Sequence, residues 1–213
     1  MKGVLAGLVT SWLACGVAAG QEVYRVDGEA SDVHWRIYSA GTFARLGHNH
    51  VISAGELSGT ATVTDGRASF EIEIPVEALV VDDPELRARY GEAFSSKPSE
   101  DDIAGTRRNM LGERVLDAEQ HPLIRIVGSG PVEPGATTLD VTFEIRGQTT
   151  RHAVPATVTV DDDAIVAEGE FQLTHEQLGL APFKVMMGAL QVAEQIDFAY
   201  RLRAVRAAGA SSP

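Results

Sequence analysis

Apolar and polar residues alternate with a period of two along most of the chain. Val33, Trp35 and Ile37 share one face of their segment, and the polar residues between them share the other. This alternation is typical of β-strands with one buried and one solvent-facing side. It recurs in segments that cover residues 33–38, 57–64, 69–74, 123–127, 138–146, 149–160, 164–174 and 191–205.

These eight segments predict an all-β domain. Most of them follow one another after short turns, which favours antiparallel neighbours. Long antiparallel strands hide their edges by closing on themselves, and an eight-stranded barrel is just wide enough for side chains or one slender ligand. We therefore expect an eight-stranded antiparallel barrel. Its interior should receive five aromatic residues on the apolar strand faces, which are Trp35, Phe70, Phe143, Phe171 and Phe198.

Helix signals replace the alternation between residues 82 and 121. Asp83 precedes Pro84, and Ser99 precedes a run of three acids, as at helix N-termini. The pattern predicts one short and one longer helix, inserted between strands three and four and packed over one barrel opening or flank. Their apolar contacts are expected from Leu86, Ile103, Met110 and Leu111.

The first twenty residues are typical of a secretory signal peptide, with Lys2 followed by an apolar stretch that ends in small residues. The single cysteine, Cys15, lies inside this stretch, so cleavage after Gly20 leaves no thiol. A lipid anchor on Cys15 is the alternative, although the residues before it fit a lipobox poorly. We expect a barrel domain over residues 21–206, a disordered tail over 207–213, and a periplasmic or secreted protein.

The net charge of the chain argues against two classes of binding partner. The formal net charge is −12, and loss of Lys2 with residues 1–20 would make it −13. An acidic chain does not suit nucleic acid, whose binding requires neutralisation of phosphates, and it should be repelled from anionic lipid surfaces.

His48 and His50 stand one residue apart in the motif GHNH, residues 47–50. On an extended segment they would share a face, and two imidazoles on one face suit a divalent cation. The alternatives are local hydrogen bonding at a barrel mouth and contact with the polar head of a ligand. A metal site needs a third ligand, for which the candidates are Asp82, Asp83, His121, His152 and His175.

No sequence motif predicts an organised catalytic site or a cofactor. His175-Glu176 begins like a zincin motif, but Gly179 stands where the second histidine belongs. Glycine-rich nucleotide-binding motifs and a nucleophile elbow are absent from the sequence. We therefore expect a protein that is not an enzyme and has no cofactor.

A second apolar segment, residues 180–190, precedes the last strand. It contains Phe183, Met186 and Met187, and methionine adapts to irregular apolar partners. These three side chains are expected either to fill the core or to line a pocket.

The order of four segments resembles the YceI-like polyisoprenoid-binding family. They are YRVDGEASDVHWRI (24–37), RRNMLGERVLDAEQHPLIRI (107–126), LDVTFEIRGQTTRHAVPATVTV (139–160) and QLGLAPF (177–183). The resemblance implies a lipocalin-like barrel whose apolar interior holds a long isoprenoid or similar lipid tail. The GHNH motif and the longer helical insertion depart from the commoner members.

Two functional hypotheses follow. The first is an exported, non-enzymatic binding protein for a polyisoprenoid, an isoprenoid quinone or a similar long-chain lipid. Its ligand would meet the aromatic residues above, Phe183, Met186, Met187, His48 and His50. The alternative is a periplasmic metal-binding or redox-accessory protein that uses His48 and His50. Assembly into a homodimer is left open.

Overall fold

The computed structural model describes residues 21–207, in which most regular structure is β-strand. The strands are β1 (Glu22–Val26), β2 (Asp32–Ala40), β3 (His50–Ala54), β4 (Ser58–Thr64), β5 (Arg67–Pro75), β6 (Leu79–Val81), β7 (Leu123–Pro131), β8 (Gly135–Ile145), β9 (Gln148–Val160), β10 (Ala164–Thr174), β11 (Lys184–Val185) and β12 (Leu190–Arg206). The expected signal peptide and, apart from Ala207, the expected tail lie outside the described residues.

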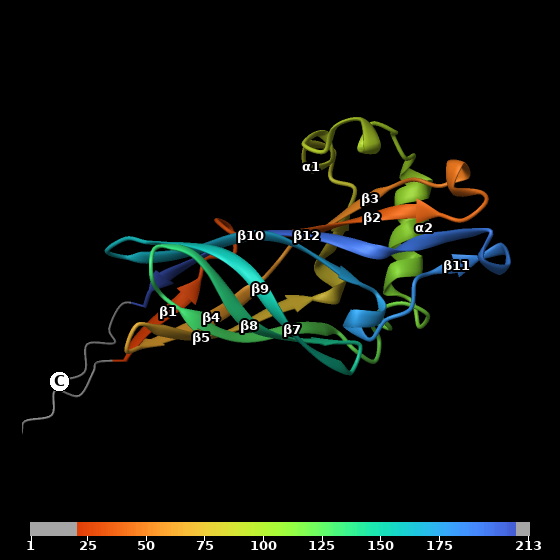
Figure 1. Cartoon of the computed structure of the whole chain (residues 1–213). Coiled ribbons are helices and arrows are strands. Elements are labelled where there is room, and N and C mark those ends of the chain that lie inside the picture. The colour runs from red at the N-terminus through yellow and green to blue at the C-terminus, as the bar shows by residue number, and fades with distance from the viewer. Residues whose placement is uncertain (1–20, 208–213) are drawn as a thin grey trace, which may run out of the picture.

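Eight strands close into an antiparallel barrel (Figure 1). Their order is β1-β4-β5-β7-β8-β9-β10-β12, and β12 pairs back with β1. Strand β12 closes the ring with its last residues, while its first part pairs with β2. From β2 the sheet continues through β3 to β6 and extends the barrel wall at one end. The predicted all-β, eight-stranded barrel is confirmed, but the predicted strand at residues 33–38 is β2, which lies outside the ring, and β1 takes its place.

Two hairpins of the barrel have two-residue turns with left-handed backbone. Asp65-Gly66 joins β4 to β5 with φ of 50° and 72°, and Arg146-Gly147 joins β8 to β9 with φ of 50° and 69°. Such turns match the right-handed twist of the flanking strands, and glycine adopts positive φ without steric cost. They set the register in which alternate side chains point into the barrel.

The helices α1 (Pro84–Ala88) and α2 (Glu100–Leu111) begin where the sequence predicts them. Asp83 caps α1, and Ser99 forms a capping box with Asp102 at the start of α2. Their expected place between strands three and four is not confirmed, because they lie between β6 and β7. Short paired segments such as β1, β3 and β6 account for the difference, since alternation alone does not resolve them. Between residues 21 and 207, no helix has the length and apolar character needed to cross a membrane.

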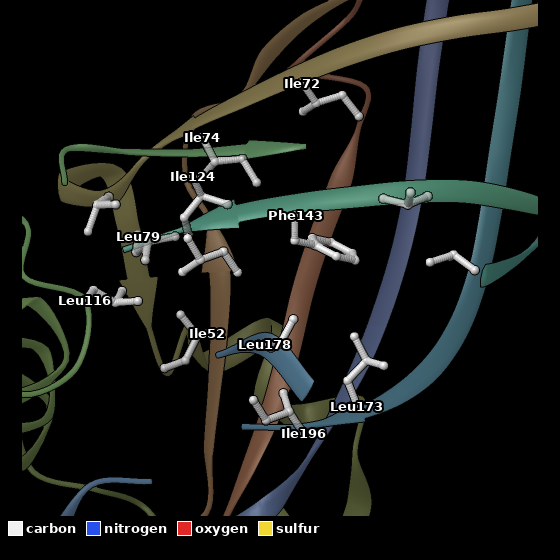
Figure 2. Close-up of a cluster of buried hydrophobic side chains, with 14 of the residues drawn as sticks. Ile52, Ile72, Ile74, Leu79, Leu116, Ile124, Phe143, Leu173, Leu178 and Ile196 are labelled. Atoms are coloured by element: carbon white, nitrogen blue, oxygen red, sulfur yellow. The ribbon is translucent and has the colours of Figure 1, made fainter. Parts of the chain in front are cut away.

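The main hydrophobic core lines the barrel interior (Figure 2). Ile103, Met110 and Leu111 of α2 pack against it, so this helix covers part of the barrel as expected. Two smaller clusters flank the main one. One consists of Tyr24, Ala61 and Val63, on β1 and β4. The other consists of Val51 of β3, Leu86 of α1 and Phe94.

Candidate functional site

The barrel encloses a cavity of about 500 Å³ that is lined almost entirely by apolar atoms. Side chains reach it from every strand of the ring except β1 and β4, from β2 and β3, and from α2. A volume of this size is within the range of small-molecule pockets. The interior is therefore hollow between its packed layers rather than completely filled.

Aromatic side chains form a row along one side of the cavity. Phe198 on β12 stacks on Phe171 on β10, with ring centroids 4.9 Å apart, and lies 6.2 Å from Trp35 on β2. Phe143 on β8 continues the row at 6.4 Å from Phe171. These four residues and Phe70 line the cavity, so the prediction that they face the interior is confirmed.

The apolar segment before β12 divides between the cavity and the surface. Phe183 lines the cavity, which is the second of its two predicted roles. Met186 and Met187 do not: they are 62% and 107% exposed, and neither fills the core nor lines the pocket. Both predicted roles are therefore wrong for the two methionines. The physical reason is local, because both residues have left-handed backbone, with φ of 50° and 54°, in the turn η5 (Met186–Gly188).

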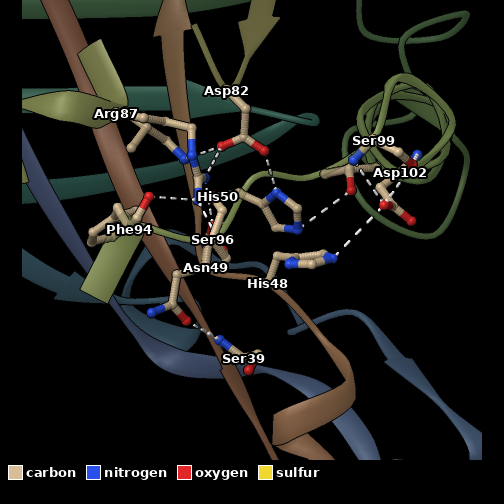
Figure 3. Close-up of polar contacts among 12 residues, drawn as sticks. Ser39, His48, Asn49, His50, Asp82, Arg87, Phe94, Ser96, Ser99 and Asp102 are labelled. Atoms are coloured by element: carbon tan, nitrogen blue, oxygen red, sulfur yellow. Dashed lines mark hydrogen bonds and ion pairs between the residues drawn. The ribbon is translucent and has the colours of Figure 1, made fainter. Parts of the chain in front are cut away.

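One group of polar residues of the cavity lies near α2, where His48 and His50 line it (Figure 3). His50 Nδ1 donates to Asp82 Oδ2 at 2.6 Å, because a carboxylate can only accept. In a neutral ring this leaves Nε2 as the acceptor, and the Thr106 hydroxyl lies 3.4 Å from it. The carboxylate thus fixes the orientation and tautomer of His50.

Asp82 is completely buried and anchors this end of the barrel. It accepts hydrogen bonds from the Val51 amide at 3.0 Å and from the Arg87 guanidinium. Burial alone would raise the pKa of Asp82, but the hydrogen bonds from His50, Val51 and Arg87 outweigh it and lower the pKa. Arg87 also donates to the Phe94 carbonyl at 3.0 Å, which ties α1 to the segment that follows it.

His48 faces the N-terminus of α2. Its Nε2 lies 3.8 Å from Asp102 Oδ2, a contact that becomes an ion pair when the ring is protonated. Hydrogen bonds from the Ser99 side chain and backbone lower the pKa of Asp102. The rings of His48 and His50 lie 6.2 Å apart and are steeply inclined to each other. The two histidines therefore have separate carboxylate partners.

The metal hypothesis requires a third ligand beside the two histidines. Of the five predicted candidates, Asp82 alone bonds to either histidine within the described part of the chain. No group of three or more His, Cys, Asp or Glu residues in that part could hold a metal ion. The structure thus assembles two histidine–carboxylate pairs rather than one ligand set.

Sequence reasoning missed several polar residues of the cavity. Asp102, Thr106 and Asn109 reach it from α2. His175, which the sequence offered only as a candidate metal ligand, lines it just after β10. Burial lowers the pKa of His175, whose Nδ1 lies 3.0 Å from the Glu194 carbonyl. Helical spacing places the three α2 residues on one face, but no sequence signal shows that this face meets the barrel interior.

Comparison with known proteins places the chain among proteins of this fold. The family model of the YceI-like domain matches residues 24–204. In structure the chain is similar to BcnA of Burkholderia cenocepacia, with 14% identity and a TM-score of 0.60, over 84% of this chain and 98% of that chain. No curated protein matches the sequence.

A second similar structure is that of a polyisoprenoid binding domain from Saccharophagus degradans, implicated in plant cell wall breakdown. The identity is 10% and the TM-score 0.57, over 86% of this chain and 98% of that chain. Identities this low establish a shared fold only. The family model, however, spans most of the sequence, and the chain therefore belongs to the YceI-like family.

Proposed function

We propose that this protein is an exported, non-enzymatic carrier that holds the tail of a polyisoprenoid, an isoprenoid quinone or a similar lipid inside its barrel. The observation that carries the proposal is the apolar cavity of about 500 Å³ within a closed barrel. Apolar cavities stay dry and bind apolar guests. The YceI-like family and the fold shared with a polyisoprenoid binding domain support this ligand class.

The energetics of the cavity favour a long hydrocarbon tail. Each buried CH₂ group contributes about 0.8 kcal/mol, whatever the identity of the chain. The flat faces of Trp35, Phe171 and Phe198 offer further contact area to an unsaturated tail. Affinity can therefore arise without many polar contacts, which fits the scarcity of polar atoms in the lining.

The polar head of the ligand would lie near α2. His48 and His50 are the titratable side chains of the GHNH motif that line the cavity, and Asn109 and Thr106 lie at the same end. With Nδ1 of His50 engaged by Asp82, its Nε2 can accept a hydrogen bond from a ligand hydroxyl, and it can donate to a ligand carbonyl when the ring is protonated. We propose that the lipid enters with its tail toward Phe70 and its head toward these histidines.

Loading with a defined prenyl lipid tests the tail site. Ile126 of β7 lines the cavity and Val127, its neighbour, does not. The protein is delipidated, incubated with a long-chain prenyl alcohol in detergent, and analysed by native mass spectrometry. We expect one bound lipid in the wild type, at least about tenfold less in Ile126→Trp because the indole projects into the cavity and obstructs the path of the tail, and normal loading in Val127→Trp. Equal loading of all three proteins would contradict the proposal.

The head site is tested by the double variant His48→Gln/His50→Gln, which keeps polarity but removes titration. If the histidines contact the head, loading with an isoprenoid quinone should change between pH 5 and 8 in the wild type and should lose that dependence in the variant. Metal content is measured in parallel. Unchanged loading across this range in both proteins would limit GHNH to a structural role and leave the tail site standing.

A further inference from the structure

Four apolar side chains project into solvent at one end of the barrel. Phe43 and Leu46 lie on the loop between β2 and β3, which contains the turn η1 (Ala44–Leu46), and Met186 and Met187 lie on the turn η5 before β12. Phe43 and Leu46 are 41% and 73% exposed. Figure 1 shows both loops protruding at the end opposite the start of β1 and the end of β12.

Backbone contacts hold the two loops against each other. The Phe43 amide donates to the Ala189 carbonyl at 2.8 Å. Gly41, with φ of 90°, packs so closely on the second loop that a Cβ would lie 2.6 Å from the Ala189 carbonyl oxygen. The exposed side chains of the two loops are therefore held on one surface by backbone contacts.

The two loops border the cavity. Gly47 and His48 follow Leu46 in the chain, and Phe183 and Val185 precede Met186; all four line the cavity. The exposed apolar surface thus continues directly from the apolar interior.

The charge of the two loops is opposite to that of the whole chain. Residues 40–47 contain Arg45, and residues 181–192 contain Lys184, and neither segment contains an acid, although the chain has 30 acids and 18 basic residues. Arg114 donates to the Lys184 carbonyl at 2.6 Å and adds a third cation. None of the three cations takes part in a salt bridge within residues 21–207.

We propose that this rim, defined as Phe43, Arg45, Leu46, Lys184, Met186 and Met187, docks on the surface of an anionic phospholipid bilayer. The apolar side chains enter the boundary between head groups and acyl chains, and the cations meet the phosphates. The repulsion expected from the net charge is offset locally, because residues 40–47 and 181–192 carry cations and no acid.

The shape and size of the rim favour a bilayer over a protein partner. A stable protein interface involves about 20 to 30 residues on each side. The rim offers a few projecting apolar tips on convex loops, which suits insertion into a fluid surface. Docking concerns the outside of the barrel and does not depend on a loaded cavity.

Vesicle flotation tests the proposal with the full protein. The wild type should float with vesicles of phosphatidylcholine and phosphatidylglycerol and much less with phosphatidylcholine alone. Leu46→Ser/Met187→Ser should lower partitioning at least about tenfold, because both changes remove apolar surface that would be buried in the membrane. Arg45→Gln/Lys184→Gln should lower it about tenfold on anionic vesicles only.

A matched control removes one exposed apolar residue and one cation at the other end of the barrel. Val160→Ser/Arg25→Gln should float like the wild type. Absence of wild-type binding, or equal flotation of all variants, would overturn the proposal. Loss of self-association in the rim variants without any vesicle binding would also overturn it and would assign the rim to a second copy of the chain.

Docking and lipid loading can fail separately. Ile126→Trp should still float with anionic vesicles although its cavity is obstructed. Leu46→Ser/Met187→Ser should still load a prenyl alcohol from detergent although it no longer floats. If the rim variant floats normally while Ile126→Trp fails to load, docking by the rim is wrong and the proposed function stands.

Discussion

The two ends of the barrel are built from the same alternating strands, yet one is plugged and the other is hollow. At the plugged end, Tyr24, Ala61 and Val63 pack together and are buried. At the cavity end, the sheet continues from β12 through β2 and β3 to β6. The helix α2 covers the interior there without filling it. Alternation specifies which side chains point inward, whereas side-chain volume and the covering elements decide whether space remains between them.

Buried charges stabilise the cavity end of the barrel, whereas apolar packing stabilises the plugged end. Asp82→Asn is expected to cause the largest effect and to lower the free energy of unfolding by about 4 kcal/mol, because Arg87 stays buried without its carboxylate. Asn tolerates the left-handed backbone at this position as Asp does, so the change isolates the charge. Urea unfolding measures it. Asp162→Asn in an exposed turn is the control and should stay near the wild type; an equal loss in both variants would refute this role of Asp82.

Replacing one aromatic residue at each end by alanine compares the packing of the two ends. Tyr24→Ala should lower the free energy of unfolding by about 3 kcal/mol, because a filled site becomes a void. Phe198→Ala should cost about half as much, since the ring already borders open space. Thermal unfolding of both variants checks the order, and a larger loss for Phe198→Ala would argue against a hollow interior.

Two glycines allow a smaller comparison, between the packed barrel wall and the helix α2 that covers the cavity. A Cβ at Gly128 would lie 2.3 Å from the Phe70 ring, so Gly128→Ala should destabilise by about 2 kcal/mol through overpacking. A Cβ at Gly105 of α2 meets nothing closer than 3.7 Å, so Gly105→Ala should stabilise by about 0.5 to 1 kcal/mol. Chemical denaturation of both variants tests the prediction, which fails if the two changes have the same sign.

The smallest expected effect is the pH response of His175. Burial lowers its pKa in the folded state below the ordinary value of 6.5. The unfolded chain therefore binds more protons below that pH, and stability should fall as pH decreases from 7 to 5. His175→Gln should show a shallower decline in unfolding free energy than the wild type, as measured by urea unfolding at each pH. A steeper decline in His175→Gln would reverse the assigned sign.

The inward positions of the wall could be predicted because they follow from local period. Trp35, Phe143 and Phe198 occupy the apolar phase of their strands, and one register slip would expose the whole face. The helix starts at Asp83 and Ser99 were equally predictable, since capping depends on neighbouring residues. Met186 and Met187 were not, because an apolar residue in a short segment without periodicity can lie in a core, a pocket or at the surface.

The sequence alone determined an all-β chain, the inward face of each long strand, the presence of helices between residues 82 and 121, and the two adjacent histidines. The tertiary structure decided that α2 meets the cavity, that Asp82 orients His50, and that four apolar tips gather at one rim. The physical reason is range. Strand faces and caps are set by residues within a few positions of one another, whereas the cavity, the charge cluster and the rim join segments that ring closure brings together from distant parts of the chain.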